Sequence, residues 1–284
     1  QGSPPEQIVF DGRDDSGEVI PQGTYRAFYT LRYRNGNEPF TSEVFVVDVT
    51  KPDIDVSVTK HIISPNGDGR NEETNISFKS SEIVTWKGSI SDPSGDTILA
   101  TDSTRTTSLI VWRGTGPDGE LVDDGTYAVN ASFTDVAGNT YKIPPEEIVV
   151  DTTDPAVSFS LDKHYFSPDE DGIKDTLTAT FSSNEPVRGL LTLRDSANRE
   201  VGTLGGFGRA YQYIEGTLRY TWGGISGSGL IVPDGMYTVS SEFTDRAGNR
   251  VSLEEKEFVI DTRQVDVDLS APKGFSPNND GKND

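Results

Sequence analysis

The sequence predicts an all-β protein made of tandem antiparallel β-sandwich modules, each slightly longer than one hundred residues. Four sequence blocks recur in the same order at that period, which indicates an array of similar units. Apolar and polar residues alternate along short segments between Gly, Pro and Asp turn signals, and no stretch longer than ten residues has helical periodicity. Short strands at this spacing are typical of a two-sheet sandwich.

The first repeated block is a nine-residue loop that begins with Ser-Pro. It reads SPNGDGRNE at residues 64–72, SPDEDGIKD at 167–175 and SPNNDGKND at 276–284, so the copies start 103 and 109 residues apart. This spacing is close to the length of one sandwich domain. Each loop is therefore expected at the same point of a separate module.

Three further blocks follow this loop in a fixed order. A large aromatic residue stands fifteen positions before the tyrosine of a D-G-T-Y-type turn. The motif D-x-A-G-N comes next, and a strand that ends in aspartate closes the module. In chain order these positions are Phe10, Tyr25 and Asp48; Trp112, Tyr127, residues 135–139 and Asp151; and Trp222, Tyr237, residues 245–249 and Asp261.

The repeat divides the chain into four parts. Residues 1–50 form the C-terminal half of a module, residues 51–152 and 153–262 form complete modules, and residues 263–284 supply the first strand and Ser-Pro loop of a further module. A lone strand cannot bury an apolar face. We therefore expect the native protein to continue at both ends.

The strand that follows the D-G-T-Y turn shows the clearest alternation in each module. Its odd-numbered side chains are predicted to face the core, as are alternate side chains of an earlier strand in each complete module. The tyrosine that opens the strand stands where sandwiches place a buried tyrosine corner. The predicted inward-facing residues are Tyr25, Ala27, Tyr29 and Leu31; Ile76 and Phe78; Tyr127, Val129, Ala131 and Phe133; Leu177, Ala179 and Phe181; and Tyr237, Val239, Ser241 and Phe243.

Taken in order, the SPNxDG loop, the aromatic residue, the D-G-T-Y turn and D-x-A-G-N resemble bacterial immunoglobulin-like (Ig-like) modules of the flagellar hook-capping type. They also resemble the modules of gliding-motility and type IX-secreted surface proteins. The resemblance covers both complete modules, and it implies tandem immunoglobulin-like sandwiches whose immediate partners are flanking modules of the same chain. Members that act as sorting signals occur once, at a C-terminus, whereas this unit is tandem and internal, which favours a stalk.

Composition excludes several classes of function. The formal net charge is -21, from 46 acidic and 25 basic residues, so a nucleic-acid partner is not expected. No apolar run approaches the roughly 18 residues of a membrane span. The chain has no cysteine, and its two histidines, His61 and His164, occupy equivalent places that indicate a structural part. Because no catalytic constellation is present, we predict that the chain is not an enzyme.

The Ser-Pro loops place oxygen ligands at a spacing that suits calcium. An EF-hand loop has oxygen donors at its third and fifth positions and glycine at its sixth, as the Ser-Pro loops do when counted from the serine. However, serine replaces the first acid, so the alternative is an Asx turn bonded to the loop's own amides. The candidate ligands are Asn66, Asp68 and Glu72; Asp169, Asp171 and Asp175; and Asn278, Asp280 and Asp284.

Sandwich topology extends the calcium hypothesis to the module junction. Carboxylates that gather within a Debye length repel one another, and a bound divalent ion would make such a joint stiff. The alternative is a solvated joint that tolerates its charge. The residues expected there are Asn66, Asp68, Glu72, Asp151, Asp154, Asp245 and Asn249.

The second module has an insertion of seven residues within residues 203–216. This glycine-rich segment contains Phe207, Arg209, Tyr211 and Tyr213, which suit contact with a glycan or a protein. The alternative is a longer hairpin whose rings cover the edge of the sandwich.

Three functions are compatible with these features. The first is a structural and adhesive spacer array in a large bacterial surface or extracellular protein, with the periplasm as the alternative location. The second is a module that binds carbohydrate or a host protein through residues 203–216. The third places these modules beside a catalytic domain outside this segment.

Overall fold

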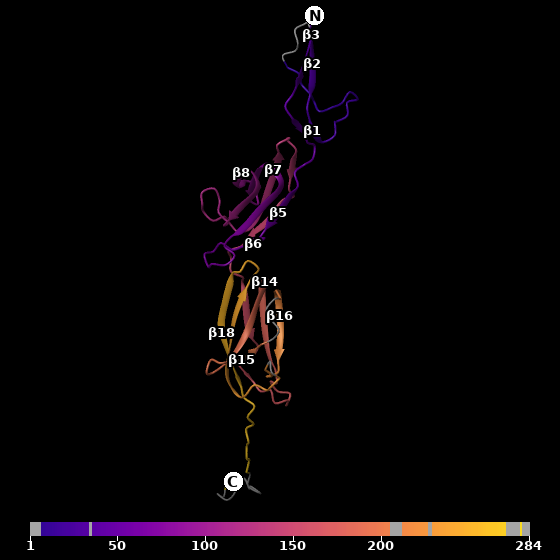
Figure 1. The fold of residues 1–284 in the computed structure, drawn as a ribbon. Helices are drawn as coiled ribbons and strands as arrows, with labels where there is room; N and C mark the ends of the chain where they lie inside the picture. Colours follow the sequence, from indigo (N-terminus) through magenta and orange to yellow (C-terminus); the bar gives the residue numbers. More distant parts are fainter. Residues whose placement is uncertain (1–6, 34–35, 205–211, 227–228, 271–278, 280–284) are drawn as a thin grey trace. The chain divides into compact units, whose positions relative to one another are not determined.

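The computed structural model of the chain describes residues 7–33, 36–204, 212–226, 229–270 and 279, which contain strands and no helix. Within that part of the chain, no helix has the length and apolar character that a membrane crossing requires. The chain divides into two compact units, Gln1–Thr153 with Arg246–Asn249, and Asp154–Asp245 with Arg250–Asp284. Figure 1 labels the strands, and each unit is described separately below.

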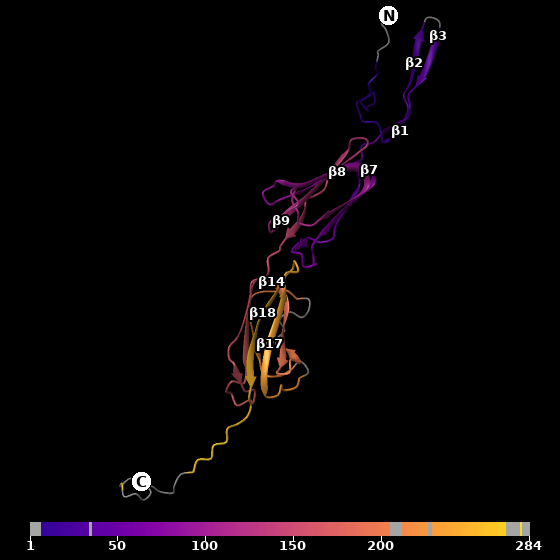
Figure 2. The ribbon, with the colours of Figure 1, turned by 90° about the vertical axis from the view of Figure 1, so that its left-hand side faces the viewer.

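One seven-stranded sheet lies between residues 54 and 150, in the first complete repeat, here called the first module. Its order is β5-β7-β9-β11-β6, with β8 beside β7 and β10 beside β9. The first half of β7 pairs with β5 and its second half with β9, so the β7–β8 hairpin takes part in both layers of the sandwich (Figure 2). The strands are β5 (Ile54–Val58), β6 (Ile62–Ile63), β7 (Thr74–Ser91), β8 (Thr97–Trp112), β9 (Gly125–Asp135), β10 (Thr140–Lys142) and β11 (Glu146–Val150).

The second complete repeat, here called the second module, has the same strand order, β12-β14-β17-β18-β13. Two shorter strands, β15 and β16, take the place of β8, and the predicted insertion falls between them. The strands are β12 (Val157–Leu161), β13 (Tyr165–Phe166), β14 (Leu177–Asp195), β15 (Glu200–Thr203), β16 (Ile214–Trp222), β17 (Gly235–Thr244) and β18 (Arg250–Ile260).

Each module encloses an apolar core of its own, as the alternation in its sequence predicts. All the inward-facing residues predicted between Ile76 and Phe243 are buried. They fall into separate clusters, one for each module, or lie beside them. Trp112 and Trp222 occupy equivalent sites, and the indole Nε1–H of each donates to a carbonyl three residues later, at 3.0 Å and 2.6 Å. The two repeats are therefore independent copies of one packing arrangement.

The strand predicted from Tyr25 to Leu31 is wrong in its continuity and in its burial. The structure instead forms two small antiparallel sheets, and Ala27 and Tyr29 are exposed. The described part of residues 1–50 contains no counterpart of β5 and β7, which supply the opposing layer in the later modules, so alternation alone has no face to bury. These strands are β1 (Gly23–Tyr25) with β4 (Phe45–Val47), and β2 (Phe28–Tyr33) with β3 (Gly36–Thr41).

The tyrosine corner is present in all three repeats. The hydroxyl of Tyr127 donates to the carbonyl of Asp123 at 2.7 Å, and Tyr237 donates to Pro233 at 2.7 Å. Tyr25 makes the equivalent bond, at 2.6 Å. Burial, reinforced by nearby aspartates, raises the pKa of Tyr127 above 10.0, which keeps the hydroxyl protonated as a donor.

The two cores fill the same space with different residues. In the first module Trp86 lies opposite Phe133, and Gly88 leaves room for its ring: a Cβ on Gly88 would lie 2.5 Å from Trp86 Cζ3. In the second module a glycine, Gly189, lies opposite the equivalent Phe243, and the buried Leu191 takes the place of Gly88. The large and small residues have exchanged positions while the strand register is preserved.

We expect Tyr127→Phe to lower the unfolding free energy of the first module by about 1 kcal/mol, because it removes one net hydrogen bond and leaves the ring packing unchanged. Urea denaturation of the full chain measures this change. Tyr141→Phe is the matched control, since Tyr141 is only half-buried and its hydroxyl anchors no turn. Equal losses in the two variants would contradict a special role for the corner.

Candidate carboxylate sites and linker clamps

The Ser-Pro loops are anchored beside the buried tryptophans by a close backbone approach. Gly114, which follows Trp112, has a φ of 65°, and a Cβ there would lie 2.7 Å from Pro65 Cγ. Gly224 has a φ of 74° and makes the same approach to Pro168, also at 2.7 Å. Only glycine accepts both the positive φ and the contact without strain. Both loops are therefore held at the same point of their modules, as the repeat predicts.

In the first loop the predicted ligands accept hydrogen bonds from loop amides. Asn66 Oδ1 accepts from the Asp68 amide at 3.0 Å, and Asp68 Oδ1 accepts from the Arg70 amide at 2.8 Å. The carboxylate of Glu72 accepts from two glycine amides, at 2.8 Å and 3.1 Å. This is the Asx-turn arrangement that the sequence analysis left open beside calcium binding.

The second loop repeats these bonds and also brings its carboxylates together. Asp171 Oδ1 accepts from the Ile173 amide at 2.7 Å, and Asp175 accepts from two loop amides at 2.8 Å and 3.0 Å. One oxygen from each of Asp169, Asp171 and Asp175 lies within 4.8 Å of the others. The candidate ligands of the third loop, Asn278, Asp280 and Asp284, lie outside the described residues.

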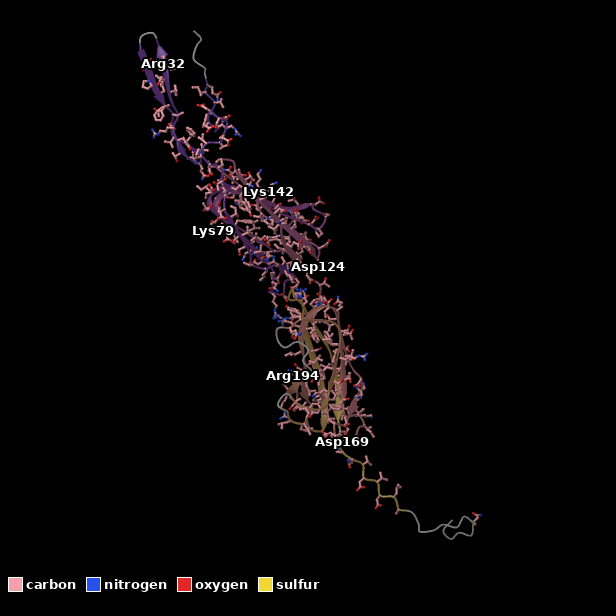
Figure 3. The ribbon with its side chains drawn as sticks, turned by 90° about the vertical axis from the view of Figure 1, so that its right-hand side faces the viewer. Arg32, Lys79, Asp124, Lys142, Asp169 and Arg194 are labelled. Atoms are coloured by element: carbon pink, nitrogen blue, oxygen red, sulfur yellow. The ribbon has the colours of Figure 1, made fainter. Side chains whose placement is uncertain are left out.

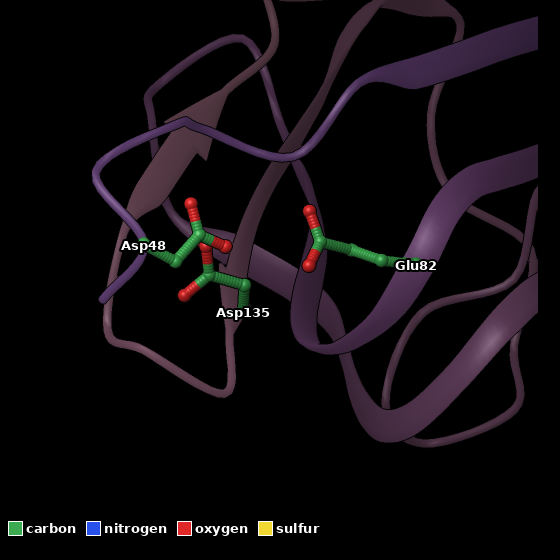
Figure 4. Close-up of side chains that lie close together, drawn as sticks. All are labelled: Asp48, Glu82 and Asp135. Carbon is green, nitrogen blue, oxygen red and sulfur yellow. The ribbon is translucent and has the colours of Figure 1, made fainter. Parts of the chain in front are cut away.

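A second carboxylate cluster, which sequence analysis did not assemble, lies at the start of the first module. It consists of Asp48, Glu82 and Asp135, and one carboxylate oxygen from each lies within 4.8 Å of the others (Figure 4). The three residues come from the segment before β5, from the bend within β7 and from the end of β9. Calcium binds oxygens at 2.3–2.6 Å, so oxygens up to roughly 5 Å apart can share one ion.

Asp135 is the buried member of this cluster, with 6% of its surface exposed. Burial alone would raise the pKa of Asp135, but bonds from the Asn139 side chain and from neighbouring backbone amides outweigh it and hold the pKa below 3.8. The carboxylate is therefore charged at neutral pH. It accepts from the Asn139 amide at 2.8 Å and from Asn139 Nδ2 at 2.9 Å.

The same residue types recur at equivalent positions of the sequence. Asp151, Glu185 and Asp245 repeat Asp48, Glu82 and Asp135, and Asn249 repeats Asn139. Asp151 and Asp245 are among the predicted junction residues, whereas the two glutamates are not. These stand in the central bend of a long strand, where no motif marks them.

The repeated motifs also hold the linker segments on either side of the first module. Asn139, from D-x-A-G-N, donates its side-chain amide to the carbonyl of Asp48 at 3.0 Å. Asp124, from D-D-G-T-Y, accepts from the Thr152 amide at 2.8 Å and from the Thr153 hydroxyl at 2.6 Å (Asp124 is labelled in Figure 3). We call these two sets of bonds the linker clamps.

Several of the predicted junction residues belong to the first unit and make contacts within it. Within the first unit, Asn249 Nδ2 donates to the carbonyls of Asp151 and Thr153 at 2.9 Å and 3.1 Å, and Asn249 Oδ1 accepts from Asn66 at 3.1 Å. Asp68 and Glu72 instead bond their own loop, as described above. These contacts within the first unit are made by side-chain amides.

The two histidines make equivalent structural contacts. The ring Nδ1 of His61 lies 3.0 Å from the carbonyl of Glu147, and that of His164 lies 3.2 Å from the carbonyl of Glu257. Both bonds tie the chain before the Ser-Pro loop to the last strand of the same module. These contacts agree with the structural role that the equivalent sequence positions of the two histidines indicate.

Of the four candidate binding residues within residues 203–216, only Tyr213 lies among the described residues; Phe207, Arg209 and Tyr211 lie outside them. Tyr213 is half-buried, its hydroxyl donates to the carbonyl of Asp245 at 3.5 Å, and the Arg188 guanidinium lies 5.7 Å from its ring centroid. This tyrosine thus packs on its own module, as in the edge-covering alternative.

The linker clamp at Asp124 is expected to weaken in acid, when the Asp124 carboxylate becomes protonated. Burial raises the pKa of Asp124, yet bonds from Thr153 and Thr152 outweigh it and lower the folded-state pKa below 3.8. The stability that this group contributes is therefore complete above pH 3.8 and is lost as the pH falls through the lower folded-state pKa.

We expect Asp124→Asn to destabilise the first module by about 1 kcal/mol at neutral pH and to have a progressively smaller effect as the pH falls through the folded-state pKa of Asp124. Thermal unfolding at a series of pH values from neutral to acid measures the difference. Asp123→Asn, at the exposed neighbouring position, is the control. A difference that persists unchanged in acid would contradict this assignment.

Comparison with known proteins places these modules among β-sandwich domains. Residues 100–152 and 207–262 match the family model of the bacterial Ig-like domain, and each range covers the second half of one repeat. Together with the all-β architecture, this match identifies the fold as Ig-like. None of the curated proteins matches the chain. The resemblance to the hook-capping and gliding types stays a prediction.

Several solved structures are similar at low identity. They are the fibronectin(III)-like modules of CbhA from Clostridium thermocellum (16% identity, 78% of this chain, 100% of that chain, TM-score 0.35), latent dimeric PorU from Porphyromonas gingivalis (10%, 88%, 31%, 0.31) and the FN1–FN3 domains of chicken CNTN1 (12%, 85%, 77%, 0.39). Likenesses at this level support no statement about function.

Proposed function

We propose that this chain is a structural and adhesive spacer, formed by consecutive Ig-like modules of a large bacterial surface or extracellular protein. The observation that carries the proposal is that the repeated motifs form hydrogen bonds to the linker segments. D-D-G-T-Y and D-x-A-G-N provide the linker clamps at Asp124 and Asn139, so these polar residues hold chain segments. A protein selected for spacing needs restrained linkers between domains that fold independently.

The clamps predict a measurable restraint on the linker. We expect Asn139→Ala to raise hydrogen exchange in the peptide covering residues 46–52 by about tenfold, because a lost side-chain bond of about 1.4 kcal/mol makes local opening more frequent. Mass spectrometry of the exchanged full chain measures this effect.

Asn130→Ala is the matched control for this experiment. Asn130 lies on the same strand as Asp135, and its side chain bonds a carbonyl within β9, at 3.4 Å, rather than the linker. We expect exchange in residues 46–52 to be unchanged in this control. A linker that exchanges equally fast in the unmodified chain and in Asn139→Ala would show that the clamp carries no restraint.

We further propose that calcium strengthens the first linker at Asp48, Glu82 and Asp135. Three carboxylates from three chain segments offer up to six oxygens, and calcium takes six to eight. An ion there would join the segment before β5 to β7 and β9, and would remove the repulsion among the charges. The converging carboxylates of Asp169, Asp171 and Asp175 are a second proposed position, although their oxygens also serve the loop amides.

We expect Glu82→Gln to weaken calcium binding to the full chain at least tenfold, because it removes one charged ligand and preserves size. Isothermal titration up to about 10 mM calcium suits the affinity range of extracellular modules, with a Kd of roughly 0.1–1 mM. Thermal unfolding gives an independent readout, since calcium at about 100 times Kd adds roughly 2.7 kcal/mol.

Glu147→Gln, at an exposed position of β11, is the control for the loss of one negative charge. Asp171→Asn, measured in the same way, tests the second proposed calcium position in the Ser-Pro loop separately from the cluster that contains Glu82. Calcium binding that Glu82→Gln and Asp171→Asn both leave intact would place the ion elsewhere. A chain whose unfolding does not respond to calcium would refute calcium strengthening and leave the spacer proposal standing.

Recognition of carbohydrate or host protein through residues 203–216 is the alternative function. Its support is compositional, from the glycine-rich segment with Phe207, Arg209 and Tyr211. The packing of Tyr213 on Asp245 and Arg188 favours a structural use of that residue.

A further inference from the structure

The outer face of the first module carries an open groove that neither the linker clamps nor the carboxylate cluster uses. The groove has a volume of about 730 Å³ and lies across β8, β7, β9 and β10. Its lining contains no aromatic side chain, and its one large apolar residue, Ile143, is buried. The surface that a ligand would contact is therefore polar and made of short side chains.

Strand register arranges these side chains in rows across the sheet. Lys87 on β7 lies opposite Asp102 on β8 and Ser132 on β9, and Ser132 in turn lies opposite Lys142 on β10. The next row along the groove places Ser89 beside Asn130. The two lysines are thus two strands apart, roughly 10 Å, with hydroxyl and amide groups around them.

The two lysines give this groove a charge opposite to that of the chain. Lys87 and Lys142 are both exposed, and neither forms an ion pair with any described residue. Asp102 is the only carboxylate in the lining, so the groove is net positive in a chain whose formal net charge is -21. Two ammonium groups that form no ion pair with a described residue, against one carboxylate in the lining, leave a local excess of one positive charge that attracts anions.

The equivalent groove of the second module has the same formal charge, but its cations are paired differently. It has a volume of about 610 Å³, and its lining includes three arginines and two glutamates, Glu242 and Glu255. Arg250 Nη1 there lies 2.6 Å from Glu242 Oε1, and Arg188 lies over the ring of Tyr213. Cations of the second groove are therefore engaged within the protein, whereas those of the first are available.

From these observations we infer that the groove of the first module binds an acidic polysaccharide. Carboxylate or sulfate groups would pair with Lys87 and Lys142, and sugar hydroxyls would bond Ser89, Asn130 and Ser132. The groove offers no apolar pocket for a hydrophobic peptide, and its lining has no aromatic ring on which nucleic-acid bases could stack. The inference gives the adhesive part of the proposed function a ligand class, and it concerns a face that the spacer role does not need.

The test measures binding of a galacturonic acid octasaccharide to the full chain by isothermal titration. EDTA is present, so that the calcium proposal cannot affect the result, and the salt is about 20 mM NaCl, where screening is weak. The fully methyl-esterified octasaccharide has the same backbone without charge. We expect the acidic form to bind at least tenfold more tightly than the ester, and its affinity to fall as salt is added.

Variants locate the site. We expect the double variant Lys87→Gln with Lys142→Gln to lose about fivefold or more in affinity, whereas Lys79→Gln, an exposed lysine of β7 outside the groove, stays within about twofold. Lys79 and Lys142 are labelled in Figure 3. Unchanged thermal unfolding of each variant confirms that the sheet is intact.

Four results would overturn the inference. Equal binding of the methyl ester would show that charge is not recognised, and equal binding of poly-glutamate would show that a glycan is not required. An equal loss in Lys79→Gln would indicate diffuse attraction rather than a groove. A loss in Tyr213→Ala with none in the lysine variants would move the site to residues 203–216 of the second module.

Discussion

Burial of an apolar core inside each module is the interaction on which every other feature depends. Trp112 and Trp222 are enclosed by their own modules, and each fixes the chain that follows it by donating its indole N–H to the next turn. The glycine two residues after each tryptophan then lies against the proline of the Ser-Pro loop. The positions of the loops, and so of their carboxylates, are consequences of core packing.

The repeated polar residues are accordingly best understood through the bonds they make with backbone. Asp124 and Asn139 hold linker segments, while Asn66 and Asp68 close their own loop. Such bonds to main-chain groups depend little on the identity of neighbouring side chains, which explains why the same short motifs serve both modules although their cores differ.

The fold could be predicted from the sequence because two signals both reflect the backbone conformation. They are the alternation of apolar and polar residues with a period of two and the repeat of slightly more than one hundred residues. Burial from Tyr127 to Phe133 and the tyrosine corner could be predicted because they depend on local spacing. The cluster at Glu82 could not, because a bend inside an 18-residue strand brings it to residues far away in sequence. The prediction at Ala27 and Tyr29 was wrong because alternation shows which side faces inward, and burial also needs an opposing layer.

The exchange of large and small residues between the two cores has a consequence for biosynthesis. A chain with neighbouring copies of one fold risks forming hybrid domains, in which a hairpin of one copy enters the other. Tryptophan at the position of Gly189 would collide with Phe243, since even a Cβ there would lie 2.4 Å from Phe243 Cδ1. A hairpin of the first module would bring Trp86 to this register, and the second core would have to repack around Phe243 to accept it, which disfavours the exchange.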